Sequence, residues 1–546
     1  MTPDGIIAGV RTAWAGKRCI TILDPCFGVG TQFLDVWAAC RADPHRPASL
    51  HVVAIAERLP DLASARDVLS AQASPQSAGL TQALLDQWPL PLAGVHRLDF
   101  EAGAVTLTLV VGPTAARAGC SARVDHVLGT QSAQTAQTAQ TAQTAQTAQS
   151  AQSAQSAGST AAPQREPWGW ESAGAGQALV VGAGLSGLAI ARALALRGWE
   201  VTVLHPGWGD QESRPHRGHA AAALTPVASR DDNVRARLSR AGTLCAQRTW
   251  RDLPEDIVTR CGALQLQRQT GRVVDLAELA HALDFPPQWI RYVTPEQASE
   301  IAGVTLDRPG LHFPMAMRVQ VQPLLESMAA TPGVRIVASR VHSLRQQNGE
   351  WLALDGAGQV LARAGQAVLA CAADVREVLG ASGMLQRGSR VDAMHALAGE
   401  ITMIPAQSAL QGLRCTVSGD GYVLPALDGW CVAGGTYVHG ATLALVTPEG
   451  QTGNLGRAAG LLGTSWTAAN LTDRDTLPGW AGWRAVLPGR LPAIGPLAGS
   501  PGVWIATGYA SRGLTWSSLG GELIGAALAG EPLPVERDLL DEINPN

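Results

Sequence analysis

Three glycines in the chain have the spacing of a phosphate-binding turn. Gly182, Gly184 and Gly187 form a Gly-x-Gly-x-x-Gly pattern. In such a turn the first glycine permits a sharp bend, the second lets the backbone approach a pyrophosphate, and the third lets a helix pack closely on a strand. The phosphates then lie at the helix N-terminus, where free N–H groups and the helix dipole favour anions. The pattern therefore predicts a dinucleotide site.

The residues around these glycines predict the elements that such a turn needs. Residues 178–182 form a short apolar run typical of a buried strand, and residues 185–196 are rich in Ala and Leu, as in a helix. Residues 198–204 supply a second apolar strand at the expected distance. We therefore predict a strand, the glycine turn, a helix and a second strand in one nucleotide-binding unit.

The second strand ends without the acid that usually binds a ribose. His205 stands at that position. His205 can hydrogen-bond a ribose hydroxyl, and Asp210 or Glu212 can reach the same group. A plain surface histidine is the other interpretation, so the ribose contacts stay open at this point.

The end of the chain returns to a similar turn, more than 300 residues later. Residues 502–508 predict a strand that runs into a turn flanked by Gly508 and Gly513, with a helix over 514–528. Backbone N–H groups there can face a flavin ring, and Arg512 can face the flavin or its phosphates. Residues 366–373 predict a further strand that ends in small residues. We therefore predict FAD and not NAD.

Composition excludes several classes of protein. Hydrophobic content is 46%, charged content is 16%, and no apolar run approaches the roughly 20 residues that span a bilayer. The N-terminus lacks a signal peptide, so we expect a cytoplasmic protein. The nine cysteines are scattered without a paired spacing, which argues against a disulfide framework and against a metal site. Lysine is absent after Lys17, which excludes a Lys Schiff base in the C-terminal region.

The 546 residues suggest about three structural units. We expect a short α/β segment over 1–129, a Ser/Thr-Ala-Gln linker over 130–170 and a long module over 171–546. The nucleotide-binding parts of this module are expected at about 177–250, 330–380 and 480–546, with the substrate parts between them. The predicted fold class is α/β: an FAD-binding doubly wound parallel sheet with an inserted mixed α+β substrate domain, preceded by the truncated α/β segment.

Four motifs carry a family resemblance from residue 179 to the C-terminus. They are residues 230–242 (Arg-Asp-Asp-Asn-Val-Arg-Ala-Arg-Leu-Ser-Arg-Ala-Gly), 419–428 (Gly-Asp-Gly-Tyr-Val-Leu-Pro-Ala-Leu-Asp), 490–496 (Arg-Leu-Pro-Ala-Ile-Gly-Pro) and 506–516 (Ala-Thr-Gly-Tyr-Ala-Ser-Arg-Gly-Leu-Thr-Trp). This part resembles the FAD module of the bifunctional tRNA wobble-uridine modification proteins of the MnmC family, relatives of the glycine and D-amino-acid oxidases. The resemblance implies oxidative removal of the carboxymethyl group from 5-carboxymethylaminomethyl-(2-thio)uridine, which leaves 5-aminomethyl-(2-thio)uridine and glyoxylate.

The implied substrate side chain is an N-substituted glycine, whose carboxylate suits an arginine fork. Arg484 and Arg490 are the candidates for this clamp, together with Arg512, and Tyr422 and Tyr509 are candidate hydrogen-bonding neighbours. Each arginine can instead make a surface or fold-stabilising ion pair. An FAD-dependent oxidase of free glycine or sarcosine, and an inactive nucleotide-binding remnant, are the alternative functions.

The N-terminal segment resembles the methyltransferase of the same family in its first half only. Asp24, Gly28 and Gly30 take the places of an S-adenosylmethionine loop, and Glu57 would hold the ribose hydroxyls of that cofactor. The strand at 124–129 should lead into an Asp-Gly-Phe-Ala-Pro catalytic loop, which is absent. The missing strands would leave unpaired sheet edges. We therefore expect a remnant in which methyl transfer is lost and which is dispensable for the oxidation.

A tRNA partner needs a local basic face, because the formal net charge is −4. Residues 231–251 hold five arginines, at 235, 237, 240, 248 and 251, with Leu238, Ala241, Leu244 and Cys245 as the expected buried stripe. We expect a helix here that turns several arginines outward to phosphates. The other interpretation is a face of internal ion pairs. The oligomeric state is left open.

Overall fold

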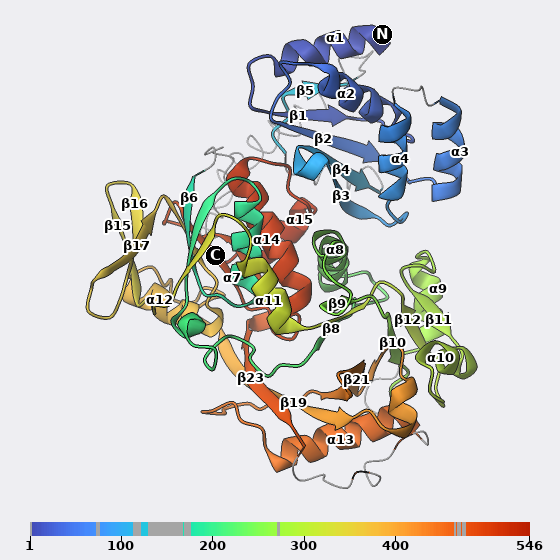
Figure 1. Ribbon diagram of the computed structural model, residues 1–546, viewed down its shortest axis with the longest axis vertical. Coiled ribbons are helices and arrows are strands. Elements are labelled where there is room, and N and C mark those ends of the chain that lie inside the picture. Colours follow the sequence, from blue (N-terminus) through green and yellow to red (C-terminus); the bar gives the residue numbers. More distant parts are fainter. Residues whose placement is uncertain are drawn as a thin grey trace, which may run out of the picture. The chain divides into compact units, whose positions relative to one another are not determined.

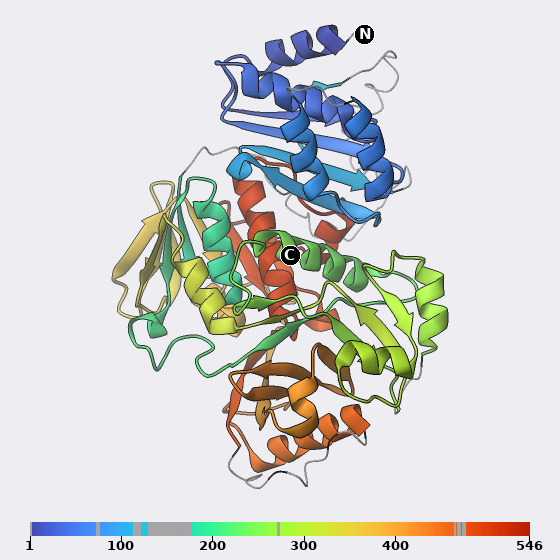
Figure 2. The same cartoon turned by 45° about the vertical axis from the view of Figure 1, so that its right-hand side comes forward.

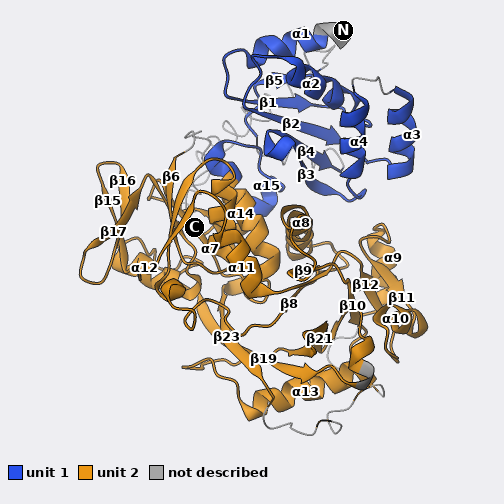
Figure 3. Cartoon of the chain, viewed as in Figure 1, with its two compact units in different colours: residues 1–172, 526–541 blue, residues 173–525, 542–546 orange. Residues whose placement is uncertain are grey.

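The computed structural model describes residues 3–72, 77–112, 122–128, 168, 176–269, 274–463, 466, 471 and 477–546. The chain forms two compact units (Figure 3). Unit 1 comprises residues 1–172 and 526–541, and unit 2 comprises residues 173–525 and 542–546. The predicted linker lies outside the described residues except for Trp168. Among the helices of the described residues, none has the length and apolar character needed to span a bilayer.

Unit 2 contains a six-stranded sheet in the order β14-β7-β6-β18-β25-β24. The strands are β6 (Gln177–Val181), β7 (Glu200–Leu204), β14 (Val334–Val337), β18 (Gln366–Leu369), β24 (Ala493–Pro496) and β25 (Val503–Thr507). All neighbours are parallel except β24, which is antiparallel to β25. After β6 the chain continues to β7 and β14 on one side, and then places β18, β25 and β24 on the other side, so the strand order reverses between β6 and β18. A doubly wound sheet binds its ligand at this point.

Two predicted helices flank this sheet. The helix after the glycine turn is α7 (Leu185–Ala195), and the C-terminal helix is α14 (Gly513–Ala529). Apolar residues of β6, β18 and β25 form the core of the sheet, with Leu179, Leu369 and Ile505 fully buried. The predicted unit of strand, glycine turn, helix and second strand is thus confirmed by β6, α7 and β7. Short apolar strands of this kind fit a sheet that is covered on both faces.

A second sheet has eight strands in the order β11-β12-β10-β20-β21-β22-β19-β23. These strands are β10 (Ala263–Leu266), β11 (Arg291–Val293), β12 (Gly310–Phe313), β19 (His395–Pro405), β20 (Thr416–Gly419), β21 (Gly421–Leu427), β22 (Trp430–Gly434) and β23 (Gly479–Val486). Helix α13 (Pro448–Leu462) packs against β19, β21 and β22, as Figures 1 and 2 show. In sequence, this mixed sheet is inserted between strands of the six-stranded sheet, where the sequence predicts a substrate domain.

Smaller elements complete unit 2. The sheet β8-β13-β9 is built from Ala222–Leu224, Met317–Val319 and Val258–Thr259, and the sheet β15-β16-β17 from Ser343–Gln347, Glu350–Leu354 and Val360–Ala364. The other α-helices are α8 (Val234–Thr249), α9 (Leu276–Leu283), α10 (Pro295–Ala302), α11 (Val321–Ala329) and α12 (Val375–Ala381).

Unit 1 is a five-stranded sheet in the order β3-β4-β2-β1-β5. Its strands are β1 (Cys19–Asp24), β2 (Ser49–Ala56), β3 (Gly94–Phe100), β4 (Val105–Val111) and β5 (His126–Val127), and its first helices are α1 (Pro3–Trp14), α2 (Thr31–Ala42), α3 (Leu62–Gln72) and α4 (Ala78–Asp86). The strands β4, β2, β1 and β5 are parallel, and β3 is an antiparallel edge. One apolar cluster joins the sheet to these helices.

The C-terminal end of the chain contributes to unit 1. Arg97 on edge strand β3 is buried, pairs with Glu531 and donates to the carbonyl oxygen of Pro532 over 3.1 Å. Helix α15 (Arg537–Ile543) follows in the same segment, and Leu539 is fully buried. Arg97 therefore ties edge strand β3 to residues distant in sequence, whereas β5, after which further strands were expected to be missing, is the opposite edge of the sheet in the described residues. A chain that starts after the linker would lack Arg97 and the other partners of residues 526–541. We therefore no longer expect the N-terminal segment to be dispensable.

Helix α8 is present where the sequence predicts it, but two of its arginines turn inward. Arg240 is 5% exposed and makes two 2.8 Å hydrogen bonds to Asp232. Arg248 lies 2.7 Å from Glu522. Leu238 and Cys245 are buried as expected, whereas the Ala241 and Leu244 positions are only partly buried. The predicted outward arginine face was wrong for Arg240 and Arg248, because Asp232, just before α8, and buried Glu522 pair with them.

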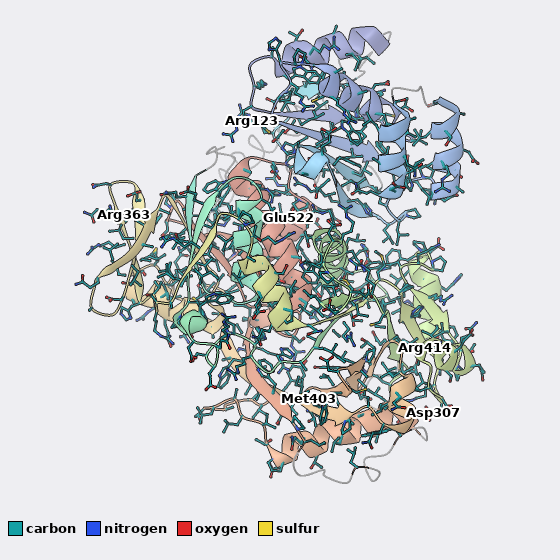
Figure 4. The ribbon with its side chains drawn as sticks, in the orientation of Figure 1. Arg123, Asp307, Arg363, Met403, Arg414 and Glu522 are labelled. Carbon is teal, nitrogen blue, oxygen red and sulfur yellow. The ribbon has the colours of Figure 1, made fainter. Side chains whose placement is uncertain are left out.

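Glu522 on α14 pairs with two arginines of unit 2 (Figure 4). Its carboxylate accepts hydrogen bonds from Arg248 on α8 and from Arg197 just after α7. Both acid and arginines are largely withdrawn from solvent. A buried acid that neutralises two arginines holds three segments together, and its removal leaves buried cations without a counter-charge.

Glu522→Gln is therefore expected to lower the free energy of unfolding by about 3–5 kcal/mol, the usual effect of breaking a buried ion pair. Chemical denaturation of the flavin-loaded protein measures this change. Glu278→Gln is the control, because its ion pair with Arg230 is more than half exposed on both sides. That variant should lose at most about 1 kcal/mol. Equal losses in the two variants would contradict the role of Glu522.

Candidate active site

The three glycines of the fingerprint turn differ in what surrounds them. A Cβ on Gly182, whose φ is +108°, would lie 2.6 Å from the carbonyl oxygen of Ala370, and a Cβ on Gly187 would lie 1.8 Å from that of Gly182. A Cβ on Gly184 would meet no protein atom within 4 Å, although Gly184 directly precedes α7. Gly182 and Gly187 are thus required by the fold, while Gly184 borders open space at a helix N-terminus. This cradle suits a pyrophosphate.

The C-terminal turn is connected to the fingerprint turn. The hydroxyl of Ser186 on α7 lies 3.0 Å from both the carbonyl oxygen of Ala506 and the hydroxyl of Tyr509. Tyr509 is buried, and burial raises the pKa of its phenol. Gly508 has a φ of +76°, and a Cβ there would lie 2.3 Å from Leu487. Tyr509 therefore joins the two cofactor-side turns, in contrast to the role beside Tyr422 that the sequence suggested.

Arg512 and Gly513 begin α14 within the same turn. Arg512 donates to the carbonyl oxygen of Thr225 over 2.8 Å, and burial, reinforced by Arg235, lowers the pKa of its guanidinium to about 10. A Cβ on Gly513 would lie 3.2 Å from Leu185, the first residue of α7. Both residues therefore lie where the N-termini of α7 and α14 approach each other.

His205, Asp210 and Glu212, the three residues predicted to bind the ribose, differ in their contacts. His205 directly follows β7, and its backbone N–H donates to the carbonyl oxygen of Val337. Burial, reinforced by Arg340, lowers the pKa of its imidazole. Asp210 accepts hydrogen bonds from its own loop, at the backbone N–H of Glu212 and the hydroxyl of Ser213. The Glu212 side chain is 82% exposed. The structure thus leaves His205 at the strand end, with the two acids engaged elsewhere.

Arg484 and Tyr422 share one face of the eight-stranded sheet. Tyr422 on β21 is paired with Gly434 on β22, Gly434 with Ile401 on β19, and Ile401 with Trp480 on β23. Directly paired residues point to the same face of a sheet, and residues an even number apart in a strand do so too. Arg484 lies four residues after Trp480, so both side chains project toward this face.

Glycines form the surface beneath these two side chains. A Cβ on Gly399 would lie 1.7 Å from an Nη of Arg484, and a Cβ on Gly434 would lie 2.4 Å from the hydroxyl of Tyr422. A Cβ on Gly435 would lie 3.3 Å from Arg484 and 3.8 Å from the Tyr422 hydroxyl. The guanidinium and the phenol therefore converge over a floor without side chains, which lets both lie flat on the sheet.

Arg484 has contacts on its own side of the pair, and Tyr422 is buried. Arg484 donates to the carbonyl oxygen of Thr436 over 2.9 Å, and its guanidinium carbon lies 4.6 Å from the ring centre of Tyr437. Burial raises the pKa of Tyr422 to about 12, so its phenol is a neutral hydrogen-bond donor at physiological pH. Arg490 is exposed in the short helix η8 (Pro488–Arg490). Of the three arginines predicted for the clamp, Arg484 is the one that the structure brings to Tyr422.

Two histidines and a tryptophan border the same face. The ring of His219 stacks on Trp480 with centroids 4.1 Å apart, and Nδ1 of His219 lies 3.1 Å from Nδ1 of His216. Burial lowers the pKa of His216 to about 4, and burial, His216 and Arg484 lower that of His219. The wall that His216, His219 and Trp480 form beside this face is therefore neutral at physiological pH. Sequence reasoning missed it, although the pair His-x-x-His in a loop after the second strand was a visible signal.

These shifts give a pH dependence of stability. The unfolded chain binds protons at both histidines below about pH 6.5, whereas folded His216 binds one only near pH 4. Stability is therefore expected to fall as pH drops from about 6.5 toward 4, and to be insensitive to these groups above that range. The double variant His216→Asn, His219→Asn should lose less stability between pH 7.5 and 5.5 in urea unfolding, while His439→Asn, at an exposed position, should behave as wild type. Equal pH dependence in all three proteins would refute this assignment.

Unit 1 keeps part of a cofactor loop. Asp24 ends β1, is fully buried and accepts a hydrogen bond from the backbone N–H of Cys26, and burial raises its pKa. Gly28 and Gly30 have φ of +57° and +89°, and Gly30 directly precedes α2. Glu57 follows β2 and is exposed. The four residues thus lie at or just after the ends of β1 and β2, and their role in holding S-adenosylmethionine stays a prediction.

Comparison with known proteins agrees with this geometry. A family model described as FAD dependent oxidoreductase matches residues 177–527. The tRNA 5-methylaminomethyl-2-thiouridine biosynthesis bifunctional protein MnmC of Burkholderia multivorans is 32% identical, with 98% of this chain and 91% of that protein covered. The chain belongs to the MnmC family. The protein of the same name from Cupriavidus necator is 31% identical, with the same coverage of both chains.

Solved structures show the fold of this MnmC-family chain. Glycine oxidase from Geobacillus kaustophilus matches with a TM-score of 0.55 and 18% identity, over 68% of this chain and 98% of that one. Iminodiacetate oxidase from Chelativorans sp. BNC1 matches with a TM-score of 0.53 and 22% identity, over 67% and 98%. The predicted fold class, the FAD cofactor and the FAD-dependent oxidoreductase activity are therefore confirmed for this member of the MnmC family.

Proposed function

We propose that unit 2 oxidises the N-substituted glycine on the wobble uridine of a tRNA, removing the carboxymethyl group from 5-carboxymethylaminomethyl-(2-thio)uridine. The products are 5-aminomethyl-(2-thio)uridine and glyoxylate. The convergence of Arg484 and Tyr422 over the glycine floor is the observation that carries this proposal, because a carboxylate is the group that such a pair selects. The names of the MnmC relatives supply the tRNA context.

The residues of the site divide the work. Arg484 would hold the substrate carboxylate through its guanidinium, and the neutral Tyr422 hydroxyl would donate a hydrogen bond to the same group. The neutral wall of His219 and Trp480 adds no cation that would disfavour the approach of an amine. Holding the carboxylate fixes the adjacent Cα–H relative to the cofactor, which is catalysis by orientation.

Gly182, Gly184, Gly187, His205, Gly508, Arg512 and Gly513 would hold FAD, which accepts a hydride from the substrate Cα when bound. The electron pair of the C–H bond leaves with its hydrogen as one hydride, and the neutral secondary amine becomes a protonated imine. Water then adds to the imine carbon and the C–N bond breaks, which releases glyoxylate and the aminomethyl group. No strong acid or base is needed for this sequence once the amine nitrogen is neutral.

We further propose that the chain stops at the aminomethyl product and that unit 1 is a remnant methyltransferase. The sequence lacks the Asp-Gly-Phe-Ala-Pro loop expected after 124–129. The alignment with the Burkholderia multivorans protein spans 619 positions against 546 residues here, so at least 73 positions are gaps in this chain. Binding of S-adenosylmethionine at Asp24, Gly28, Gly30 and Glu57 without methyl transfer agrees with both observations. A cytoplasmic location follows from a tRNA substrate.

Anaerobic reduction of the flavin tests this proposal. The yellow protein is mixed with tRNA that carries the carboxymethylaminomethyl group, or with free glycine or sarcosine. We expect rapid bleaching and glyoxylate release with the tRNA, and far slower bleaching with the free amino acids. Faster reduction by glycine or sarcosine than by the tRNA would identify a small-amine oxidase. A flavin that no substrate bleaches would identify an inactive remnant.

A further inference from the structure

Exposed large apolar side chains gather at one place in unit 2. In the part of the chain that the structure describes, twelve such residues are exposed, and half of them lie either within residues 437–446 or at Trp483. This aromatic-apolar patch consists of Tyr437, Val438, Leu443, Leu445, Val446 and Trp483. Leu443 is 67% exposed and Trp483 is 46% exposed. Exposed apolar side chains grouped in this way mark an interaction surface, whereas scattered ones need no explanation.

The patch borders the carboxylate clamp. Ala398 on β19 is paired with Trp483 on β23 and makes a bridge to Val438, so Trp483 and Val438 flank one residue. Tyr437 lies over the Arg484 guanidinium at 4.6 Å. Trp483 is adjacent to Arg484 in β23, and its side chain points to the opposite face of the sheet. Tyr437 therefore lies on the Arg484 face, whereas Trp483 and Val438 lie on the opposite face, and the adjacent residues 437 and 438 connect the two.

The charge of the surrounding segments favours a polyanion. Residues 435–446 and 479–490 contain no Asp or Glu and carry Arg484, Arg490 and His439. The only acid of β19 is Glu400, which is 3% exposed and accepts hydrogen bonds from the backbone N–H and the hydroxyl of Thr447. A partner with negative charge and flat apolar faces would meet cations and aromatic rings on these two segments.

We propose that this patch is a stacking surface for the unpaired bases of an RNA loop, with Trp483 as its main platform. The proposal rests on the proposed function, since the RNA is the tRNA that carries the modified uridine. For that base to place its carboxylate on Arg484, it must leave the stack of its neighbours. Those neighbours then lose their own stacking partners, and exposed aromatic rings replace them. Tyr437, which lies over the Arg484 guanidinium, would place a stacked base next to the site of oxidation, and Trp483 would hold a further base on the opposite face of β23.

Affinity for a fluorescein-labelled anticodon stem-loop, followed by anisotropy, tests the proposal. Trp483→Ala is expected to weaken binding about 5- to 100-fold, the usual loss of one base–aromatic stack. Trp483→Phe should restore most of the affinity, because it keeps an aromatic face. Tyr292→Ala is the matched control, since Tyr292 on β11 is an exposed aromatic residue outside the patch. A fully paired RNA duplex of equal length should bind weakly and alike to all four proteins.

Flavin absorbance shows that the variants are folded and loaded. If Trp483→Ala binds the stem-loop as tightly as the wild type does, and the wild type oxidises the tRNA, the stacking surface is overturned and the proposed function stands. Failure of the wild type to bind or oxidise any RNA would overturn both. Sedimentation that shows dimers in the wild type and monomers in Trp483→Ala, with unchanged RNA affinity, would assign the patch to a second copy of the chain. If the wild type binds anionic vesicles and Trp483→Ala is the one variant that does not, the patch would be assigned to a membrane surface. The dimer result and the vesicle result would each contradict the proposal.

Discussion

Gly184→Val is expected to give a folded protein without the yellow colour of bound flavin. Gly184 has an extended backbone with φ −81° and ψ −171°, a conformation that valine adopts readily, and a Cβ there meets no protein atom within 4 Å. The fold therefore tolerates the change. The added side chain would instead occupy the space in front of α7, where the pyrophosphate is expected. Absorbance of the purified protein and its content of released FAD measure the effect.

The two other fingerprint glycines supply the contrast. A Cβ on Gly187 would overlap the carbonyl oxygen of Gly182, and one on Gly182 would overlap that of Ala370. Gly187→Ala is thus expected to impair folding itself, with low soluble yield. Full flavin content in Gly184→Val would remove the fingerprint turn from the cofactor site. Loss of solubility in Gly184→Val, equal to that of Gly187→Ala, would show that its space is not free.

Arg484→Ala should reduce kcat/KM on the modified tRNA by about 10²- to 10³-fold, with normal flavin content. The reason is that a buried charge-assisted contact to a carboxylate is worth about 2–5 kcal/mol. Arg484→Lys keeps the charge but not the planar fork, so an intermediate loss is expected. Initial rates of flavin reduction over a range of tRNA concentrations give kcat and KM separately.

Arg490→Ala is the control for this variant. Arg490 lies in the same region of the sequence and is exposed in η8. Its removal is expected to change kcat/KM by no more than about threefold, as for a surface contact worth well under 1 kcal/mol. Equal losses in the two variants would show that the carboxylate clamp does not depend on the glycine floor. An unaffected Arg484→Ala would exclude Arg484 from substrate binding altogether.

The nucleotide-binding unit was predictable because its signals are local. The apolar runs, the three glycines and the Ala-rich helix occupy fewer than 30 consecutive residues, and their periods follow from the strand and helix geometry itself. Helix α8 was predictable for the same reason. Its exposed face was not, because Arg240 and Arg248 are paired by Asp232 and by Glu522, and Glu522 lies 274 residues from Arg248.

The substrate side of the site depends on contacts distant in sequence. Tyr422 and Arg484 meet through the register of four strands, which no local pattern encodes. The loop with His216 and His219 has no periodicity, so its stacking on Trp480 could not be inferred. The addition of residues 526–541 to unit 1 was likewise hidden, since Arg97 pairs with a residue 434 positions away.

Nucleoside mass spectrometry of tRNA is the most direct test of the central claim. A strain that lacks its own oxidase for this nucleoside accumulates 5-carboxymethylaminomethyl-2-thiouridine, and it is complemented with this chain or with Gly184→Val. We predict that the wild-type chain converts this nucleoside to the 5-aminomethyl form without further methylation, and that Gly184→Val leaves it unchanged. Persistence of the carboxymethylaminomethyl nucleoside with the flavin-loaded wild-type chain would contradict the proposed function. Appearance of the methylaminomethyl nucleoside in a host without its own methyltransferase would contradict the loss of activity in unit 1.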